Sequence, residues 1–226
     1  MSMNIKWLSR FAIVVAYLPL ISFIIFIGLY PLQFFLSDGT VGILNMKSDT
    51  LLKDKVWKTF FNTHIIFGGL ALLVGWIQFN KYIRNNYRRL HRIVGMLYVF
   101  FTWLSVLGIG YISFFAEGGA IAFFGFVIGG LIWFYTTIQG YITIRNGLFT
   151  KHQQYLTYSY ATCLGAATLR IWLPILVRYT DNFILSYQLV SWISWLPNLI
   201  VAFFIIKRQA SKATEKISLI GNKHFT

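Results

Sequence analysis

The sequence contains few charged residues for its length. Asp, Glu, Lys and Arg make up 12% of its 226 residues, whereas soluble domains carry about 25%. Hydrophobic residues make up 57%, and 19% of the residues are aromatic. A chain of this composition cannot cover a globule of its own size with charged groups, and it is too apolar to remain disordered. The composition therefore predicts an integral membrane protein.

Cysteine and the motifs of soluble enzymes are scarce or missing. Cys163 is the single cysteine, so no disulfide can form within one chain. The sequence contains no GxSxG, HExxH, CxxC or phosphate-binding loop. No pair of acidic residues falls within a long apolar stretch, which argues against a proton relay built from carboxylates. These absences favour no enzyme class, identify no catalytic residue and leave the metal content open.

Long uncharged stretches separate short clusters of charge. No charged residue lies between Arg10 and Asp38. Arg170 alone interrupts the stretch from Lys151 to Arg178. A helix needs about 20 apolar residues to cross a bilayer core of about 30 Å, and none of the stretches alternates like a barrel strand. We therefore predict an all-α integral membrane bundle of six transmembrane helices. The predicted spans are residues 11–30, 59–80, 93–115, 119–144, 154–177 and 185–206.

The distribution of Lys and Arg predicts the orientation of these spans. With the N-terminus in the cytoplasm, 14 of the 20 basic residues fall in cytoplasmic segments and five fall in external ones. Five of the six acidic residues are then external. We therefore predict that both termini are cytoplasmic and that the basic segments contact an anionic inner leaflet. Nucleic acid is not an expected partner, because no soluble domain presents a basic face.

The chain contains no linker that would separate two domains. Residues 1–206 are predicted to form a single transmembrane domain, and residues 207–226 a basic cytoplasmic tail that we expect to be mobile. The longest connection, residues 31–58, is external in the predicted orientation. Small residues in the second, fourth and fifth spans mark positions where helices can approach closely. They are Gly68, Ala71, Gly75, Gly125, Gly129, Ala161 and Gly165.

Three polar residues lie near the external side of the predicted bundle, namely Asn62, His64 and Arg170. His64 lies about one and a half turns below the external end of the second span, and Arg170 roughly two turns below that of the fifth. An Arg at mid-span costs about 3 kcal/mol, and no acid lies in any span to pair with it. Pro174 cannot donate to the carbonyl of Arg170, which predicts a small polar cavity there. His64 and Arg170 are therefore candidate ligand-binding residues, with the alternative that Arg170 extends to external head groups.

A second polar level lies near the predicted cytoplasmic ends of the helices. Gln78 precedes His91 by 13 residues, and Gln139 precedes His152 by the same spacing, which reflects either a duplicated helical hairpin or coincidence. Imidazole can ligate haem or a metal, move protons or bind a lipid phosphate. His91 and His152 are therefore candidate cofactor ligands, with the alternative that they are interfacial residues among head groups. Candidate ligand-binding residues at this level are Gln78 and Gln139, together with Asn198, which lies deeper in the predicted bundle.

Several motifs follow one another along residues 60–202. They are His64-x3-Gly68-x2-Ala71-Leu72-Leu73-x-Gly75-x2-Gln78-Phe79, Leu90-His91-Arg92-x2-Gly95-x2-Tyr98, Gly125-Phe126, Trp133, His152-x8-Ala161, Thr168-Leu169-Arg170-x3-Pro174 and Trp195-x-Pro197-Asn198-Leu199. In these motifs the chain resembles a bacterial family of predicted membrane proteins, domain of unknown function 2306. The resemblance implies a multi-pass protein of the bacterial cytoplasmic (inner) membrane and implies no activity. It points to His64, His91, His152, Arg170 and Asn198 as positions on which the motifs are built.

The first functional hypothesis is a membrane redox protein of the cytochrome b type. Haem sites in helix bundles use His residues from facing helices, with flanking cations for the propionates. His91 and His152 open two spans on the same predicted side, with basic residues beside them, which suits one haem b near the cytoplasm. A two-haem arrangement is not expected, because His64 has no His partner at its level.

The second hypothesis is a non-redox module, namely a small transporter, a lipid- or anion-binding protein or an accessory subunit. Arg170 would hold an anionic head group, and Asn198 with Pro197 would mark a break in the last span. A third hypothesis, a lipid-active enzyme with His64 as general base, has the least support, because the chain supplies no matched nucleophile or acid.

Overall fold

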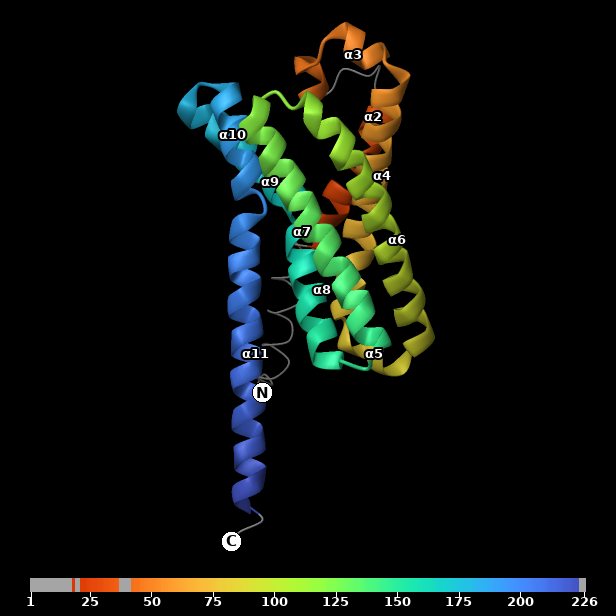
Figure 1. Ribbon diagram of the computed structural model, residues 1–226, viewed down its shortest axis with the longest axis vertical. Helices are drawn as coiled ribbons and strands as arrows, with labels where there is room; N and C mark the ends of the chain where they lie inside the picture. Colours follow the sequence, from red (N-terminus) through yellow and green to blue (C-terminus); the bar gives the residue numbers. More distant parts are fainter. Residues whose placement is uncertain (1–17, 19–20, 37–41, 224–226) are drawn as a thin grey trace, which may run out of the picture. The chain divides into compact units, whose positions relative to one another are not determined.

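A computed structural model describes residues 18, 21–36 and 42–223, and the figures draw the other residues as a grey trace (Figure 1). The described residues form helices and turns and contain no strand, as the sequence predicts. The chain divides into two compact units, Met1–Gly108 and Ile109–Thr226, which we call the N-terminal unit and the C-terminal unit. Each unit is described by itself.

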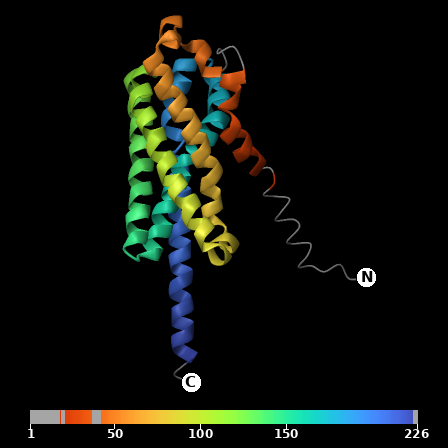
Figure 2. The same ribbon diagram turned by 90° about the vertical axis from the view of Figure 1, so that its right-hand side faces the viewer.

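The N-terminal unit is organised around two long helices. These are α4 (Lys55–Gly75) and the greater part of α6 (Arg88–Ile112), which lie side by side in Figure 2. Shorter elements precede and connect them. They are the helical residues 21–29, α2 (Leu32–Leu36), η1 (Gly42–Met46), α3 (Asp49–Lys53), η2 (Trp76–Phe79) and α5 (Lys81–Asn86).

The C-terminal unit begins at the end of α6 and contains the remaining elements. They are η3 (Ser113–Phe115), α7 (Gly119–Arg145), α8 (Phe149–Cys163), α9 (Gly165–Thr180), α10 (Phe183–Ile193) and α11 (Leu196–Lys223). Helices α7 and α8 pack along each other (Figure 1). The tight turn between them contains Gly147 at φ +74°, a conformation that favours glycine.

Five helical stretches of the described residues are long and apolar enough to cross a membrane. They are Lys55–Phe79, Arg88–Phe115, Gly119–Arg145, Phe149–Thr180 and Phe183–Lys212. Four of them contain one of the last five spans predicted from the sequence, and Lys55–Phe79 contains the predicted span 59–80 except for Asn80. The predicted first span, residues 11–30, lies partly outside the described residues, and its described part belongs to a shorter apolar helix, Ile21–Phe34. The count of six spans therefore stays a prediction.

The last two membrane-length stretches are each interrupted once. One interruption lies at Leu164, between α8 and α9. The other lies at Ser194 and Trp195, between α10 and α11. Pro197 accounts for the second break, because proline has no N–H to donate to the carbonyl of residue 193, as a continuous helix would require. The sequence predicts a break at Pro197, and the structure has it two residues earlier.

Helix α11 continues through most of the segment that is predicted to be a separate tail. The helix runs from Leu196 to Lys223 without an interruption at residue 207. Figures 1 and 2 show that its C-terminal half extends past the ends of α7 and α8. The segment predicted to be a separate basic tail is therefore helical as far as residue 223. Its mobility stays a prediction.

The burial pattern of the described residues suits a hydrocarbon solvent. Large apolar side chains such as Phe114 and Phe149 are more than half exposed. The interior, by contrast, contains fully buried hydroxyl residues. They are Thr102, Ser105, Thr137, Ser159, Ser186 and Ser191, each 0% exposed. Small hydroxyl residues between closely packed helices are typical of membrane proteins, where lipid covers the apolar outer face.

Candidate functional site

In the N-terminal unit, His64 of α4 is joined to Ser105 of α6. The His64 Nδ1 atom lies 3.0 Å from Ser105 Oγ and 3.3 Å from the Ser105 carbonyl oxygen. The Ser105 hydroxyl in turn donates to the His64 carbonyl oxygen at 3.1 Å. The two helices approach closely here because Gly108 has no side chain, and a methyl group in its place would lie 2.7 Å from His64 Cβ.

These contacts together fix the tautomer of His64. A carbonyl oxygen can only accept, so both carbonyl contacts are satisfied when Nδ1 carries the proton and the serine hydroxyl points at the His64 carbonyl. Ser105 Oγ then accepts from Nδ1. The consequence is that Nε2 of His64 is the ring nitrogen that holds the lone pair and acts as the basic atom.

The structure brings together Gln78 and His91, which the sequence places at one polar level. Gln78 lies at the end of the first membrane-length stretch and is buried, and its Nε2 donates to the His91 carbonyl oxygen at 3.4 Å. Gly95, one turn beyond His91, leaves room for the amide, since a methyl group there would lie 3.3 Å from Gln78 Oε1. The contact therefore involves the backbone of His91, and it fixes where α6 starts against the end of α4.

The equivalent pair in the C-terminal unit makes a different contact. The His152 imidazole approaches Gly140, the residue after Gln139, and its Nδ1 lies 2.8 Å from the Gly140 carbonyl oxygen. Nδ1 must donate in this bond, which leaves the lone pair on Nε2. A ring N–H bonded to a backbone carbonyl is the arrangement that orients imidazoles for haem or metal ligation. His152 therefore presents Nε2 as an atom that could hold a metal or cofactor, whereas the two 13-residue spacings do not produce the same local structure.

Two hydroxyl groups join α7 to α8 in the interior of the C-terminal unit. Thr137 Oγ1 and Ser159 Oγ lie 2.6 Å apart, and both residues are fully buried. Thr137 also donates toward the Trp133 carbonyl at 2.7 Å. Sequence reasoning missed this pair because serine and threonine within an apolar run give no periodic signal.

The two interruptions of the C-terminal unit meet at one polar junction. Thr168, in the first turns of α9, donates to the carbonyl oxygen of Ser194, at the end of α10. Asn198 Nδ2 donates to the same carbonyl at 3.0 Å and lies 3.2 Å from Thr168 Oγ1. Gly165 packs against Trp195 at this point, since a methyl group there would contact Trp195 Cβ at 3.4 Å. The predicted site residue Asn198 therefore closes the junction between the broken helices.

Trp195 anchors the second interruption against α7. Its Nε1 atom lies 2.8 Å from the Ser191 carbonyl oxygen and 3.2 Å from that of Gly125. Its ring occupies the space left by Gly129, where a methyl group would lie 2.9 Å from Trp195 Nε1. The sequence marks these glycines as close-approach positions but does not identify the side chain that fills the space.

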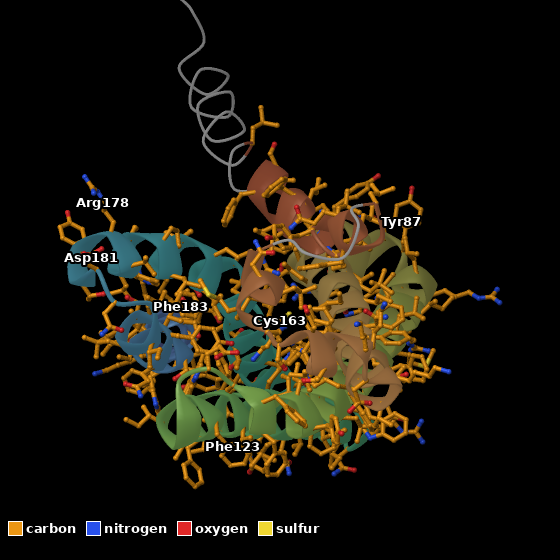
Figure 3. All side chains as sticks on the ribbon, turned by 90° about the horizontal axis from the view of Figure 1, so that it is seen from above. Tyr87, Phe123, Cys163, Arg178, Asp181 and Phe183 are labelled. Carbon is orange, nitrogen blue, oxygen red and sulfur yellow. The ribbon has the colours of Figure 1, made fainter. Side chains whose placement is uncertain are left out.

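Arg170 lies two residues beyond Thr168 on α9. Its Nη1 donates to the Ala166 carbonyl oxygen of the same helix at 2.7 Å. Arg170, Pro174 and Arg178 recur every four residues and therefore lie along one face of α9. Pro174 and Arg178 also line a shallow, open hollow together with Ile175 and Tyr179. Figure 3 shows Arg178 pointing away from the helices of its unit, whereas Cys163 lies buried among them.

A conventional metal centre is not found in the described part of the chain. No group of three or more His, Cys, Asp or Glu side chains is placed to hold a metal ion there. The chemistry of the described site residues is that of imidazoles with a fixed tautomer, hydroxyls, amides and guanidinium groups. These groups bind anions, ligate haem or pass protons.

The chain matches the model of one family along most of its length. That family is described as predicted membrane protein (DUF2306), and the match covers residues 61–206. No curated protein and no solved structure matches the chain. The matched region contains every predicted site residue. They are His64, Gln78, His91, Gln139, His152, Arg170 and Asn198.

Proposed function

Because the chain belongs to the predicted membrane protein family DUF2306, we propose that it is a multi-pass protein of the bacterial cytoplasmic membrane that binds a small anionic or lipid ligand through its C-terminal unit. In this proposal it has six spans, and both termini are cytoplasmic. The excess of Lys and Arg in alternate connections supports that orientation. The apolar exposed surface supports lipid as the surrounding solvent.

The proposed ligand site is the face of α9 that carries Arg170, Pro174 and Arg178, here called the α9 arginine face. The recurrence of two guanidinium groups on this face, on either side of a proline, is the observation that carries the proposal. The two arginines are eight positions apart, which spans about 12 Å of helix. A guanidinium binds carboxylate or phosphate oxygens through two parallel hydrogen bonds. The shallow hollow at Pro174 and Ile175 offers an apolar surface for the rest of a lipid.

The cost of placing Arg170 in a span supports a functional role. A charged side chain near the middle of a bilayer costs about 3 kcal/mol on insertion scales. The Ala166 carbonyl takes one of the five N–H donors of the guanidinium. An anionic group at this face would neutralise the charge as well as accept hydrogen bonds.

The helix interruptions beside Arg170 give the site a means of moving. Binding sites of membrane transporters are typically formed at discontinuous helices. Here Thr168, two residues from Arg170, is hydrogen-bonded to the second interruption at Ser194. A ligand that displaces Arg170 therefore also displaces the junction between the two broken helices. This coupling favours a transport or accessory role over a purely structural one.

Native mass spectrometry of the purified protein tests this proposal. The wild-type protein is expected to retain a co-purifying anion or anionic lipid. The Arg170→Gln variant is expected to lose that species, whereas Arg145→Gln, a matched change at the end of α7, is expected to retain it. Retention of the same species by Arg170→Gln would exclude the α9 arginine face as the site.

A second function, haem binding, is favoured by one specific contact. The Nδ1 proton of His152 is held by the Gly140 carbonyl at 2.8 Å, so Nε2 presents the lone pair that iron requires. Lys151 and Arg145 are nearby along the chain and would neutralise the propionates. A bound haem would supply one-electron transfer at the start of α8, where His152 lies.

An absorption spectrum of protein produced with ample haem supply tests the second function. A Soret band is expected in the wild-type protein and should disappear in His152→Ala. A matched His224→Ala variant should keep the band, because that residue lies outside the family match. A colourless wild-type protein would exclude haem binding.

A further inference from the structure

The turn between the first two membrane-length stretches carries a high density of positive charge. Within residues 80–92, here called the α5–α6 corner, five side chains are Lys or Arg and none is acidic. They are Lys81, Arg84, Arg88, Arg89 and Arg92. All of them except Arg84 are exposed. The corner belongs to the N-terminal unit, where α5 joins α4 to α6, and neither proposed function uses it (Figure 1).

The described part of the N-terminal unit offers no carboxylate near this charge. Its acidic residues are Asp49 and Asp54, which lie at the opposite end of α4, about 30 Å of helix away. Like charges three or four positions apart on a helix repel each other. The corner is therefore a region of positive potential, and a bound anion would relieve the repulsion.

The cations form one pair on each of the two helices. Lys81 and Arg84 are three positions apart on α5. Arg88 and Arg92 are four positions apart on α6. Each pair therefore lies on one face of its helix, where two cations can bind the oxygens of one phosphate. Because only Tyr87 separates the two helices, two such pairs fit a ligand with two phosphate groups better than a ligand with one.

Hydrogen bonds hold the backbone of the corner in place. Asn80 Oδ1 accepts from the N–H of Tyr82 at 2.9 Å and from the N–H of Ile83 at 3.2 Å, which fixes the start of α5. The Tyr87 N–H donates to the Ile83 carbonyl oxygen at 2.8 Å, and the Tyr87 carbonyl oxygen accepts from the His91 N–H at 3.0 Å. The backbone that carries the cations is thus already ordered, so a ligand does not have to order it on binding.

Aromatic and apolar side chains at the corner suit a lipid rather than a soluble anion. One membrane-length stretch ends at Phe79 and the next begins at Arg88, so the corner lies at a membrane surface. Tyr82 is 65% exposed and Tyr87 is 52% exposed, and their rings meet edge to face with centroids 5.9 Å apart. Exposed tyrosines are typical of the membrane–water interface. Leu90, which is 47% exposed, adds an apolar surface on α6 for acyl chains.

We propose that the α5–α6 corner is a specific binding site for a lipid whose head group carries two phosphates, such as cardiolipin. Lys81 and Arg84 bind one phosphate. Arg88 and Arg92 bind the other, and Leu90 contacts the acyl chains. The general attraction of basic segments to an anionic leaflet depends on net charge, whereas this site depends on where the four cations lie. It belongs to the N-terminal unit and is independent of the ligand and haem sites that we propose in the C-terminal unit.

A lipid titration followed by native mass spectrometry tests the site. The full-length protein in detergent receives equal amounts of cardiolipin and phosphatidylglycerol. We expect the wild-type protein to bind one cardiolipin about tenfold more tightly than phosphatidylglycerol. The double variant Arg88→Gln/Arg92→Gln should lose this preference. Lys207→Gln/Arg208→Gln, which removes the same charge from α11, is the matched control and should keep it.

The outcomes separate a specific site from general attraction. Equal loss of cardiolipin by the double variant and by the α11 control would show that net charge alone attracts the lipid, and it would overturn the proposal. A wild-type protein with no preference would overturn it too. So would displacement of cardiolipin by an excess of inorganic pyrophosphate, because the ligand would then be a soluble diphosphate.

Two further variants keep the result independent of folding and of the α9 arginine face. Thermal unfolding without lipid shows whether Arg88→Gln/Arg92→Gln folds, and Lys81→Gln/Arg84→Gln, which removes the other phosphate contact, should also lose the preference. Arg170→Gln should bind added cardiolipin like the wild-type protein, whether or not the α9 arginine face binds an anion. Loss of cardiolipin in Arg170→Gln alone would contradict the α5–α6 corner as the site.

Discussion

The hydroxyl of Thr168 on α9 is hydrogen-bonded to the carbonyl oxygen of Ser194, where α10 ends. This bond connects the interruption of one membrane-length helix to the interruption of the next. A carbonyl exposed by a break needs a donor when no water is available. Thr168 supplies that donor from a different helix, and Asn198 supplies a second at 3.0 Å. The two breaks therefore stabilise each other.

Removal of the Asn198 amide should weaken this junction. Asn198→Ala loses the bonds from Nδ2 to Ser194 and Thr168, and hydrogen bonds between membrane helices contribute about 0.6 kcal/mol on average. We expect a loss of about 1–2 kcal/mol in the free energy of unfolding. Denaturant titration in mild detergent measures the change. Asn86→Ala, which removes an exposed amide on α5, should change stability much less.

The approach of α4 to α6 should not tolerate a side chain at Gly108. A methyl group there would lie 2.7 Å from both His64 Cβ and the Phe60 carbonyl oxygen. Gly108→Ala should therefore destabilise the protein by about 1–3 kcal/mol, the usual cost of overpacking. Gly110→Ala is the matched control, because nothing lies within 4 Å of its added carbon. Thermal unfolding compares the two, and equal melting temperatures would contradict the close approach.

Loss of the indole N–H should affect Trp195 more than an exposed tryptophan. Trp195→Phe keeps most of the ring but removes the donor to the carbonyls of Ser191 and Gly125. We expect a cost of about 1–3 kcal/mol, since two buried carbonyls lose the indole donor. Trp103→Phe, at a site that is 46% exposed, is the control. If both variants unfold at the same denaturant concentration, the indole does not anchor the break.

Reporter fusions test the proposed orientation. Because the basic segments alternate with acidic ones, reporters at the N- and C-termini should both be active in the cytoplasm. A reporter inserted after Asp181 should be active on the other side. A chain with only the five membrane-length helices would place its termini in opposite compartments. That result would contradict the additional span predicted at residues 11–30.

The spans could be predicted from the sequence because their signal is the absence of charge. The gap from Lys58 to Lys81 predicts a helix at 59–80, and the structure has Lys55–Phe79. The interruption at Leu164 could not be predicted in this way, because Gly165 is also compatible with an unbroken membrane helix. The position of the interruption depends on the contact between Gly165 and Trp195, which lies 30 residues after that glycine.

The polar contacts were predictable only in part. The sequence places Gln78 and His91 at one polar level, and the structure joins them through the backbone carbonyl of His91. The same spacing for Gln139 and His152 gives a bond to Gly140 instead, because the tight turn at Gly147 sets a different register. The pairing of Ser105 with His64 depends on which faces of two helices meet, and hydropathy alone does not determine this.

The packing of Trp195 against α7 has a consequence for sequence variation. The indole fits because Gly129 lacks a side chain, so each residue sets the largest size that the other can have. An exchange of the glycine for alanine or serine should survive only alongside a smaller residue at position 195. Among relatives of this protein, the two positions should therefore change as a correlated pair, with the bulk of one compensating for the bulk of the other.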